Sequence, residues 1–546
     1  MCSTEAGEAR VYRTGHAAAG PEVRGRQRLG WALLLASLAW ISCDDGSRPR
    51  PSPSEPTRPN ILLVVWDTVR ADRMSLYGHS RETTPKLDSW ARGGVVFEDV
   101  VSAAGYTVPS HASLFTGLLP SEHCATGGTS TLRDDYTTLA EILRDEGYAT
   151  FLYAENPHLA KAQQISQGFG RHQHPWSERY IERAREILTE KVAGDASSEL
   201  QERVAEMERG EAQLTPWNVK AAGELAESAV LDFLDELPPN QPFFVFVNYM
   251  EAHRPYIPPR EYRERFMTPA QVERSYRVDR SWETIWEYTF GRRDLSDEEL
   301  EITRATYDAA LLELDELFGS LLETLDERGL LQNTIVALTS DHGEHLGEQH
   351  MFDHQSTLYE PVLRVPLVLW HPESLSPARR SDPVMNFDLF PTLLELADVQ
   401  HTSERPLSAR SLLEPDPERT RLAQEPESES SAVRTMRRLH PGWDPAPWLR
   451  SQRALYRGRY KWIAPSTGDE ELYDLERDPA EARNLAALRE IDASILRATL
   501  AQLESELSPC TEGAVPSVSE RDRALLEMLG YGSGEDSGPS HRDESR

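Results

Sequence analysis

The chain has 546 residues and a formal net charge of −32, from 58 Lys and Arg against 90 Asp and Glu. Hydrophobic residues make up 39% of it, enough for a sizeable core, so wholesale disorder is excluded. The acidic balance argues against nucleic acid as a partner, because no surplus of Lys and Arg exists to displace phosphate counterions. The four cysteines, Cys2, Cys43, Cys124 and Cys510, are too few and too scattered for a disulfide scaffold or a CxxC metal site.

Residues 1–43 carry the pattern of a secretory signal, with basic residues, a short apolar run at 29–41 and a small-residue exit. The run is shorter than the about 20 residues of a comfortable membrane span. An uncleaved membrane anchor and a lipoprotein signal acylated at Cys43 are the alternatives. Residues 44–59 are rich in Pro, Ser and Arg, which is typical of a linker. We therefore expect an exported protein, periplasmic or extracellular, that meets a membrane only through this N-terminal segment.

Continuous apolar runs predict strands that are buried on both faces of a parallel sheet. They lie at 61–66, 149–154, 243–249, 334–339 and 366–370. Helical patterns, such as those at 138–146 and 307–328, lie between them. Strands that alternate with helices predict an α/β fold with a central, mainly parallel sheet. Because ligands in such folds bind outside the carboxyl ends of the strands, the residues directly after each run are the site candidates.

Composition also predicts the order of the domains. We expect one large α/β domain over residues 60–400. Residues 401–450 carry little apolar content and predict a mobile excursion. Short aromatic runs and a helical pattern over 451–510 predict a small subdomain of antiparallel strands and one helix. The tail, residues 511–546, is predicted to be disordered.

Polar residues that can bind a metal ion follow two of the predicted strands. Asp67 comes directly after the first run, and Asp341 and His342 follow the run at 334–339. If both strands are central and parallel, two carboxylates and an imidazole converge at one edge of the sheet. Mixed oxygen and nitrogen ligands suit Mn²⁺, Zn²⁺ or Mg²⁺ better than the oxygen cage that Ca²⁺ prefers. A lone Asp at a strand end is commonly a helix cap, but the pair of segments favours a divalent metal site.

A third candidate segment is GYTVPSHASLFTG at 105–117. Pro109 suits the first residue of a helix, and Gly117 suits its end. Thr107 would then stand just before a helix N-terminus, where backbone N–H groups and the helix dipole attract anions. By itself this pattern is only a capping motif.

Together these segments resemble the sulfatase family of the alkaline-phosphatase superfamily. The resemblance is carried by NILLVVWDTVRADRMSLYGH, TVPSHASLFTGLLPSEH, YMEAHRPY and TSDHGEHLGEQHMFDH, and it extends in the family's order from about residue 60 to 485. It implies the alkaline-phosphatase-like fold: a large α/β domain with a central, mainly parallel sheet flanked by helices, and a small C-terminal subdomain of antiparallel strands and a helix. It also implies that Asp67, Asp341 and His342 are metal ligands. Thr107 falls at the position of the nucleophile, which also contacts the metal.

The resemblance implies catalytic roles for three histidines. His253 matches the motif histidine that approaches the scissile ester. His354 stands where many members have a Lys that touches the bound anion, and His111 replaces the Arg of the C-x-P-S-R signature. Members with two metal ions use an Asp-x-x-x-His element, but the residue four before His253 is Tyr249, so we expect a single ion. His253 is then available to protonate the leaving oxygen, since the reference pKa of histidine, about 6.5, suits neutral pH.

The residue at the nucleophile position departs from the family pattern. Sulfatases with Cys or Ser there convert it to formylglycine, whose hydrated aldehyde attacks the ester. Threonine cannot give this aldehyde, because its β-carbon already carries a methyl group. We therefore expect Thr107 to act unmodified, as a metal-activated alkoxide, since a divalent cation lowers the pKa of a bound hydroxyl. Thr nucleophiles in this superfamily are associated with phosphodiesterases, phosphonate hydrolases and headgroup transferases.

The sequence therefore predicts a metal-dependent hydrolase of sulfate or phosphate-type esters of small molecules, glycans or lipids. One alternative is an envelope transferase of phosphoglycerol-like or phosphoethanolamine-like headgroups. Such transferases usually carry several membrane spans, and this chain has one short apolar segment. A second alternative is a non-catalytic envelope protein that keeps the fold for binding, which the retained metal ligands disfavour.

Overall fold

The structure is a computed structural model. It describes residues 58–126, 131–160, 164–193, 222–354, 356–402, 405–426 and 430–510. All of these belong to one compact unit, Pro56–Arg546. The predicted export signal, most of the predicted linker and the predicted disordered tail lie outside the described residues. Within the described part of the chain, none of the helices combines the length and the apolar content needed to span a membrane.

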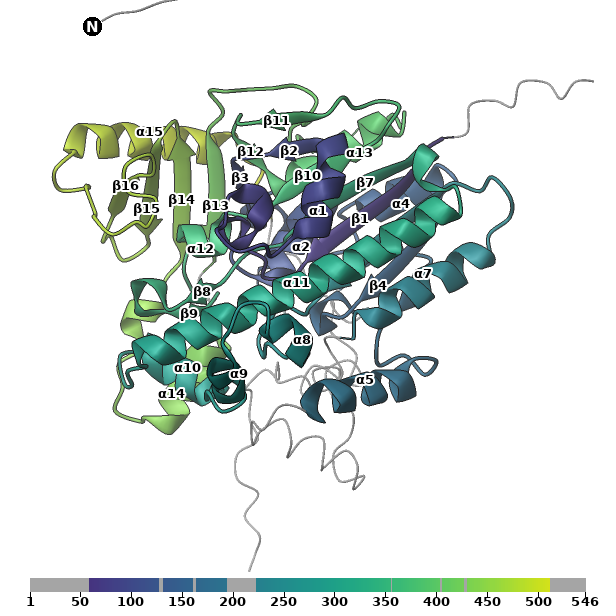
Figure 1. The fold of residues 1–546 in the computed structure, drawn as a ribbon. Coiled ribbons are helices and arrows are strands. Elements are labelled where there is room, and N and C mark those ends of the chain that lie inside the picture. Colours follow the sequence, from purple (N-terminus) through teal and green to yellow (C-terminus); the bar gives the residue numbers. More distant parts are fainter. Residues whose placement is uncertain are drawn as a thin grey trace, which may run out of the picture. The chain divides into compact units, whose positions relative to one another are not determined.

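An eight-stranded sheet forms the centre of the large domain (Figure 1), in the order β11-β2-β10-β7-β1-β6-β4-β5. These strands are β1 (Asn60–Trp66), β2 (Val95–Phe97), β4 (Ala149–Ala154), β5 (Arg171–Gln173), β6 (Phe243–Tyr249), β7 (Thr334–Thr339), β10 (Leu367–Trp370) and β11 (Ala378–Arg380). β1 pairs in parallel with β6 and β7, and β4 pairs in parallel with β5 and β6. β10 runs antiparallel to β7 and β2. The prediction of an α/β fold with a mainly parallel sheet is confirmed, and each predicted strand is present.

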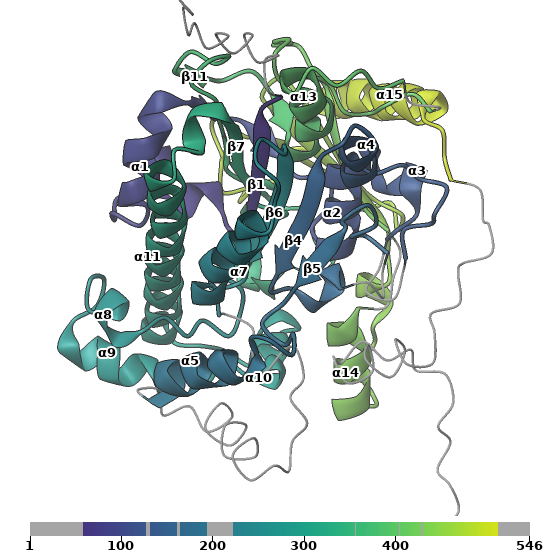
Figure 2. The ribbon, with the colours of Figure 1, turned by 90° about the vertical axis from the view of Figure 1, so that its right-hand side faces the viewer.

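Helices cover both faces of this sheet (Figure 2). On one face, Ile61, Leu63 and Val65 share a core with α2 (Thr107–Thr116), α4 (Leu139–Asp145) and α13 (Leu389–Leu396). On the other face, the alternate residues of β1 pack with α1 (Pro85–Trp90), α7 (Glu224–Asp235) and α11 (Asp297–Glu327). Since successive side chains of a strand point to opposite faces, burial on both sides explains why β1 is a continuous apolar run.

Shorter elements surround the sheet. The helices are α3 (Pro120–His123), α5 (Ile181–Ala193), α8 (Arg260–Arg263), α9 (Pro269–Ser275), α10 (Trp282–Thr289) and α12 (Glu360–Leu363). Two small pairs of strands are β3 (Val100–Val101) with β12 (Val384–Met385), and β8 (His345–Leu346) with β9 (Phe352–Asp353). Of these elements, β9 matters most for the site, because the residue that follows it is His354.

The C-terminal subdomain is a four-stranded antiparallel sheet with one helix. Its strands are β13 (Arg421–Glu425), β14 (Gln452–Arg457), β15 (Tyr460–Pro465) and β16 (Glu471–Asp474). Helix α15 (Glu490–Glu506) joins their core through Ala493, Leu496 and Leu500. This subdomain agrees with the predicted antiparallel strands and helix.

Residues 401–450 differ from the predicted mobile excursion. They contain β13, whose Leu422 and Ala423 are buried, and α14 (Ser431–Leu439), whose Ala432 and Met436 pack against α10. All five residues of β13 are buried, three of them polar or charged, and α14 buries apolar residues on one face only. Low overall apolar content therefore did not reveal these two elements.

One disulfide, between Cys124 and Cys510, joins the end of α3 to the chain that follows α15. The backbone N–H of Cys510 also donates to the carbonyl of Ser121, at 3.0 Å. The two cysteines are 386 residues apart, so their spacing gave no sign of the pairing. The bond ties the C-terminal subdomain to the large domain.

Candidate active site

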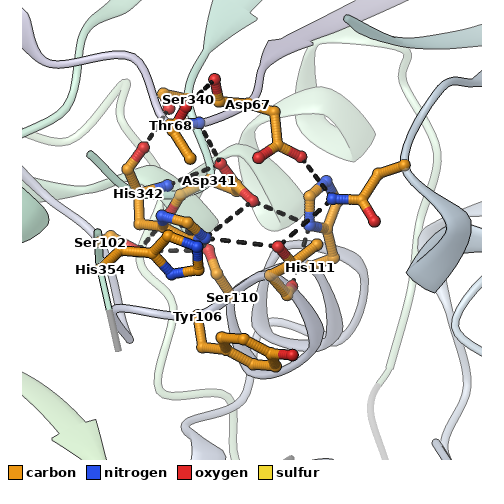
Figure 3. Close-up of polar contacts among 12 residues, drawn as sticks. Asp67, Thr68, Ser102, Tyr106, Ser110, His111, Ser340, Asp341, His342 and His354 are labelled. Carbon is orange, nitrogen blue, oxygen red and sulfur yellow. Dashed lines mark hydrogen bonds and ion pairs between the residues drawn. The ribbon is translucent and has the colours of Figure 1, made fainter. Parts of the chain in front are cut away.

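The carboxyl ends of the central parallel strands bring the predicted metal ligands together. Asp67 follows β1 directly, and Asp341 and His342 follow β7 after one intervening residue. One possible ligand atom from each of these residues lies within 4.8 Å of the others, and all three residues are fully buried. Figure 3 shows the carboxylates of Asp67 and Asp341 and the ring of His342 grouped at one point.

The Asp341–His342 segment is held in place by its backbone. The carbonyl of Asp341 accepts a hydrogen bond from Ser110 of α2, at 2.7 Å, and another from Ser102. The His342 Nδ1 lies 3.0 Å from the carbonyl of Gly343, so Nδ1–H donates to it and the Nε2 lone pair is directed elsewhere. Burial lowers the pKa of His342 well below its usual value, which keeps this ring neutral, the form that binds metal ions.

The environment of Asp341 fits a bound cation. Its Oδ1 accepts from the backbone N–H groups of His342 and Thr68, at 2.8 and 3.2 Å, whereas its Oδ2 is buried and accepts no hydrogen bond from the described residues. Burial, followed by the charge of Asp67, raises the pKa of Asp341 well above its usual range. Two ligands of one ion at about 2.0–2.6 Å can be up to about 5 Å apart, which matches the observed spread. Asp67, Asp341 and His342 therefore suit a divalent metal ion.

Thr107 is the first residue of α2, at the same place. Its Oγ1 lies 3.4 Å from His342 Nε2. The helix begins two residues earlier than the sequence predicted, with Pro109 in its first turn instead of at its first position. This is tolerated because the first N–H groups of a helix have no partner within it, so the missing N–H of Pro109 costs nothing. Gly117 ends the helix in a left-handed conformation, with φ 70°, as predicted.

His111 lies behind Thr107, one turn along α2. Its Nδ1 donates to the carbonyl of Thr107 at 3.0 Å and lies 3.6 Å from Asp341 Oδ2. The side chain is fully buried, and this burial lowers the pKa of His111 to about 4. A neutral ring in this place lies next to both the backbone of Thr107 and the carboxylate of Asp341.

The other two predicted histidines lie on the outer side of the cluster. The ring of His354 stacks on that of His342, with centroids 4.2 Å apart, and its Nδ1 donates to the carbonyl of Gly105 at 3.0 Å. The ring of His253 lies edge-on to His354 at 5.8 Å. His253 Nδ1 donates to the carbonyl of Arg254 at 2.7 Å. All the site residues that the sequence predicted thus lie in one cluster.

Two asparagines in the cluster were missed by the sequence reasoning. Asn156 Nδ2 donates to Asp67 Oδ2 at 2.7 Å and lies 3.4 Å from Thr107 Oγ1. Asn248 Nδ2 donates to the same oxygen of Asp67 at 3.3 Å. Asn156 comes two residues after β4, so inspection of the residues beyond each strand end could have found it. Asn248 lies inside β6 and has no such signal.

Tyr106 and His158 form a further pair that the sequence did not reveal. The hydroxyl of Tyr106 lies 3.0 Å from His158 Nε2, and its ring stacks on His354 with centroids 5.6 Å apart. Burial, with a smaller contribution from nearby histidines, lowers the pKa of His158 to about 3. Tyr106 is only partly buried and directly precedes Thr107 in the chain.

Hydrogen bonds also hold Thr68, the residue after Asp67, in place. The Oγ1 of Thr68 lies 2.7 Å from the carbonyl of Asp67 and 3.0 Å from that of Ala252. Its hydroxyl therefore serves the backbone of the turn, where φ of Thr68 is 60°.

Comparison with known proteins places the chain in a family. The sequence model of the Sulfatase family matches residues 59–399. An arylsulfatase of Clostridium perfringens is 26% identical over 460 residues, which cover 78% of this chain and 90% of that protein. An N-acetylglucosamine-6-O-sulfatase of Bacteroides thetaiotaomicron is 24% identical over 446 residues, 68% of this chain and 73% of its own. The phosphonate monoester hydrolase of Agrobacterium radiobacter has a similar structure, with a TM-score of 0.64 and 21% identity over 82% of this chain and 95% of that one.

The chain therefore belongs to the sulfatase family of the alkaline-phosphatase superfamily. It is an enzyme of the class that hydrolyses sulfuric or phosphoric esters.

Proposed function

We propose that the protein is a metal-dependent ester hydrolase in which Thr107, without modification, is the nucleophile. One observation carries this proposal: Thr107 Oγ1 lies 3.4 Å from His342 Nε2, beside the buried carboxylates of Asp67 and Asp341. A hydroxyl placed next to a metal-binding cluster is the arrangement that covalent ester hydrolysis needs.

Asp67, Asp341 and His342 would hold one divalent ion. When bound, such an ion lowers the pKa of a neighbouring hydroxyl and neutralises negative charge on the transferred group. Thr107 also stands at the start of α2, where the partial positive charge of the helix dipole favours an anion. The amide of Asn156 donates toward both Asp67 and Thr107, which fixes the direction of attack.

The reaction then proceeds in two displacements. In the first, Thr107 Oγ1 loses its proton to water and bonds to the sulfur or phosphorus, while the bond to the leaving oxygen breaks. His253 donates a proton from Nε2 to that oxygen. In the second displacement, His253 takes a proton from a water molecule, which attacks the Thr107 ester and releases sulfate from a sulfate ester, a phosphate monoester from a phosphodiester, or a phosphonate from a phosphonate ester. The hydroxyl of Thr107 is regained by protonation, so the enzyme returns to its starting state.

One observation bears on the choice between sulfur and phosphorus. The relatives in sequence include sulfatases, and the similar structures include both phosphonate monoester hydrolases and a 2-O GAG sulfatase, so they do not decide between the two. Thr107 cannot become formylglycine, which removes the group that sulfatases use for attack. We therefore propose phosphodiesters or phosphonate esters as the better substrates and sulfate esters as the weaker ones.

A panel assay tests the proposed function. The purified protein is incubated with the p-nitrophenyl esters of sulfate, phosphate, phenyl phosphate and phenylphosphonate, each with added Mn²⁺, Zn²⁺, Mg²⁺ or Ca²⁺. We expect turnover of at least one ester that depends on the ion and stops with chelator. A protein that binds metal but hydrolyses none of the four esters would contradict the proposal.

We also propose that the protein works outside the cytoplasm. The Cys124–Cys510 disulfide supports this, because disulfides persist mainly in oxidising compartments. The signal-like pattern of residues 1–43 points the same way. A reporter enzyme fused after Pro59 should be found active outside the cytoplasm. Reporter activity confined to the cytoplasm would overturn the proposal of export.

A further inference from the structure

Two buried carboxyl groups follow neighbouring strands at the edge of the sheet that carries the active site. Glu155 comes directly after β4, and Glu251 comes two residues after β6. These strands pair in parallel in the central sheet (Figure 2), and both side chains are buried. Glu155 is the residue before Asn156, and Glu251 stands two residues before His253. Both therefore lie close in the chain to side chains of the site.

Each of the two carboxyl groups has one oxygen with a backbone partner and one without. Glu155 Oε2 accepts the N–H of Met250 at 2.6 Å, and Glu251 Oε1 accepts that of Gly223 at 2.9 Å. Glu155 Oε1 and Glu251 Oε2 are buried and accept no hydrogen bond from a described donor. The two side chains are close enough to form a hydrogen bond with each other. Such a bond requires a proton on one of them, because a carboxylate can only accept.

The charges around the pair decide which group carries that proton. The ammonium group of Lys191, on α5, lies 3.6 Å from Glu251 Oε1, which favours the ionised form of Glu251. Lys191 also lies 2.5 Å from Glu313 of α11, so this ammonium group faces three buried carboxyl groups. Burial, followed by the charge of Glu251, raises the pKa of Glu155 well above its usual range. At neutral pH, Glu155 is therefore the protonated partner, and its Oε1–H donates to Glu251 Oε2.

Two buried tyrosines and a glycine also face the pair. Burial raises the pKa of Tyr153, on β4, and of Tyr249, on β6, well above the usual value, so both phenols are neutral. A Cβ at Gly223 would lie 2.8 Å from Glu251 Oε1 and 2.9 Å from the ring of Tyr249. A glycine at this position therefore permits the backbone of α7 to approach the pair closely.

Backbone hydrogen bonds connect the pair with the site. Met250 donates its N–H to Glu155, and its carbonyl accepts the N–H of His253 at 3.0 Å. The N–H of Glu155 donates to the carbonyl of Asn248 at 3.2 Å, and the N–H of Asn156 donates to the side chain of Asn248 at 3.0 Å. The segments that carry Asn156 and His253 are thus joined to each other through Glu155.

We propose that Glu155 donates a hydrogen bond from its protonated carboxyl group to ionised Glu251, and that this pair positions Asn156 and His253 for the reaction at Thr107. The positioning role rests on the proposed function, but the shared proton does not. Gln at position 155 would keep the arrangement, since its amide donates to Glu251 and its carbonyl accepts from Met250. Gln at position 251 would not, because its amide replaces one of two accepting oxygens with a donor.

Infrared spectroscopy of the full chain tests the shared proton without turnover. The difference spectrum between the wild type and Glu155→Gln is recorded at neutral pH. We expect a C=O stretching band of a protonated carboxyl group in the wild type that is absent from the variant. A difference spectrum that shows the loss of a carboxylate band instead would overturn the proposal, because Glu155 would then be ionised.

Turnover of the best ester, per folded protein, tests the positioning role. Glu155→Ala should lower turnover about 10- to 100-fold, as is typical for groups that orient the residues of a metal site, and Glu155→Gln should restore it to within about threefold. Glu251→Gln should lose about tenfold or more. If Glu155→Ala does not fold, the comparison of Glu155→Gln with Glu251→Gln decides, and an equal loss in both would overturn the proposal.

The matched control is Asp315→Ala. Asp315 is a buried carboxyl group that likewise accepts backbone N–H groups, those of Lys86 and Leu87 in α1. Its removal should lower the unfolding temperature but leave the turnover of the folded protein unchanged. Wild-type turnover by Glu155→Ala, or a loss in Asp315→Ala as large as that in Glu155→Ala, would show that Glu155 has no positioning role. Failure of every ester in the substrate panel would instead count against the proposed function, while the infrared result stands by itself.

Discussion

The direction of the Asp67 carboxylate depends on two amides whose orientation the backbone fixes. Asn156 Oδ1 accepts the N–H of His158 at 2.9 Å, and Asn248 Oδ1 accepts the N–H of Asn156 at 3.0 Å. Both NH₂ groups are therefore turned toward Asp67 Oδ2. Groups that orient metal ligands in this way typically change metal affinity or activity about 10- to 100-fold when they are removed.

Asn156→Ala should accordingly lower turnover of the best ester about 10- to 100-fold. Asn333→Ala, whose side chain donates to the carbonyl of Arg58 at the opposite end of the sheet, is the matched control and should keep wild-type turnover. The metal affinity of both variants is measured in the same experiment. If Asn156→Ala kept both the affinity and the turnover of the wild type, the amide would have no positioning role.

Asp341 is the proposed metal ligand whose removal should affect metal binding most directly. Asp341→Ala removes Oδ2, which accepts no hydrogen bond from the described residues, and Oδ1, which accepts from the backbone of Thr68 and His342. We expect the purified protein to lose its bound metal and remain folded. Elemental analysis of the folded variant checks this. Asp72→Ala, which changes an Asp that pairs with Arg70 outside the cluster, should keep the metal. Unchanged metal content in Asp341→Ala would remove it from the ligand set.

At the scale of elements, the sequence was most informative where a strand is buried on both faces. β1, β4, β6 and β7 were predictable because their apolar runs are continuous, and the residues directly after them include Asp67 and Asp341. β13 and α14 were not predictable from apolar runs, because β13 buries polar as well as apolar side chains and α14 buries only one face. Helix α2 begins two residues before the predicted start, because Pro109 is acceptable anywhere in the first turn of a helix. His253 and His354 lie in loops with no periodic pattern, so only the family resemblance identified them.

The C-terminal sheet contains a carboxyl group that should make stability depend on pH. Glu425, at the end of β13, is buried, and burial raises its pKa to about 8 from an ordinary value of 4.5. Between these values the folded state holds a proton that the unfolded state releases, so stability falls as the pH rises through this window. Below about pH 4.5 both states are protonated, and this loss is absent.

Glu425→Gln should therefore raise the unfolding temperature at about pH 8.5 and change it little at about pH 4.5. Thermal unfolding of the wild type and the variant at both pH values measures the difference. Glu490→Gln, at an exposed position on α15, is the control and should have no effect at either pH. An equal effect of Glu425→Gln at both pH values would show that the proton on Glu425 is not responsible.

At the scale of the whole molecule, the family resemblance predicted the large domain, its subdomain and the gathering of the site. It could not predict the Cys124–Cys510 bond, because two cysteines 386 residues apart carry no local pattern. Nor could it predict the packing of α14 on α10. Contacts between distant segments of this kind follow from the folded structure and not from any one stretch of sequence.

The disulfide gives a prediction for the intact protein. When the protein is purified from an oxidising compartment, Cys124 and Cys510 should resist alkylation until a reductant is added. Peptide mapping by mass spectrometry before and after reduction measures this. Cys124→Ser should unfold at a lower temperature, since a cross-link over a long loop restricts the unfolded chain. Alkylation of both cysteines without reductant would contradict the assigned bond.

The central claim is that Thr107 attacks the ester, and the turnover of Thr107→Ala tests it most directly. The variant is assayed with saturating metal on the best ester of the panel, after its metal content and unfolding temperature have been shown to match the wild type. Removal of a covalent nucleophile leaves only the catalysis due to binding and electrostatics, so we predict a loss of about 10³-fold or more. Wild-type turnover by Thr107→Ala would mean that water attacks the ester directly, and the covalent mechanism would be wrong.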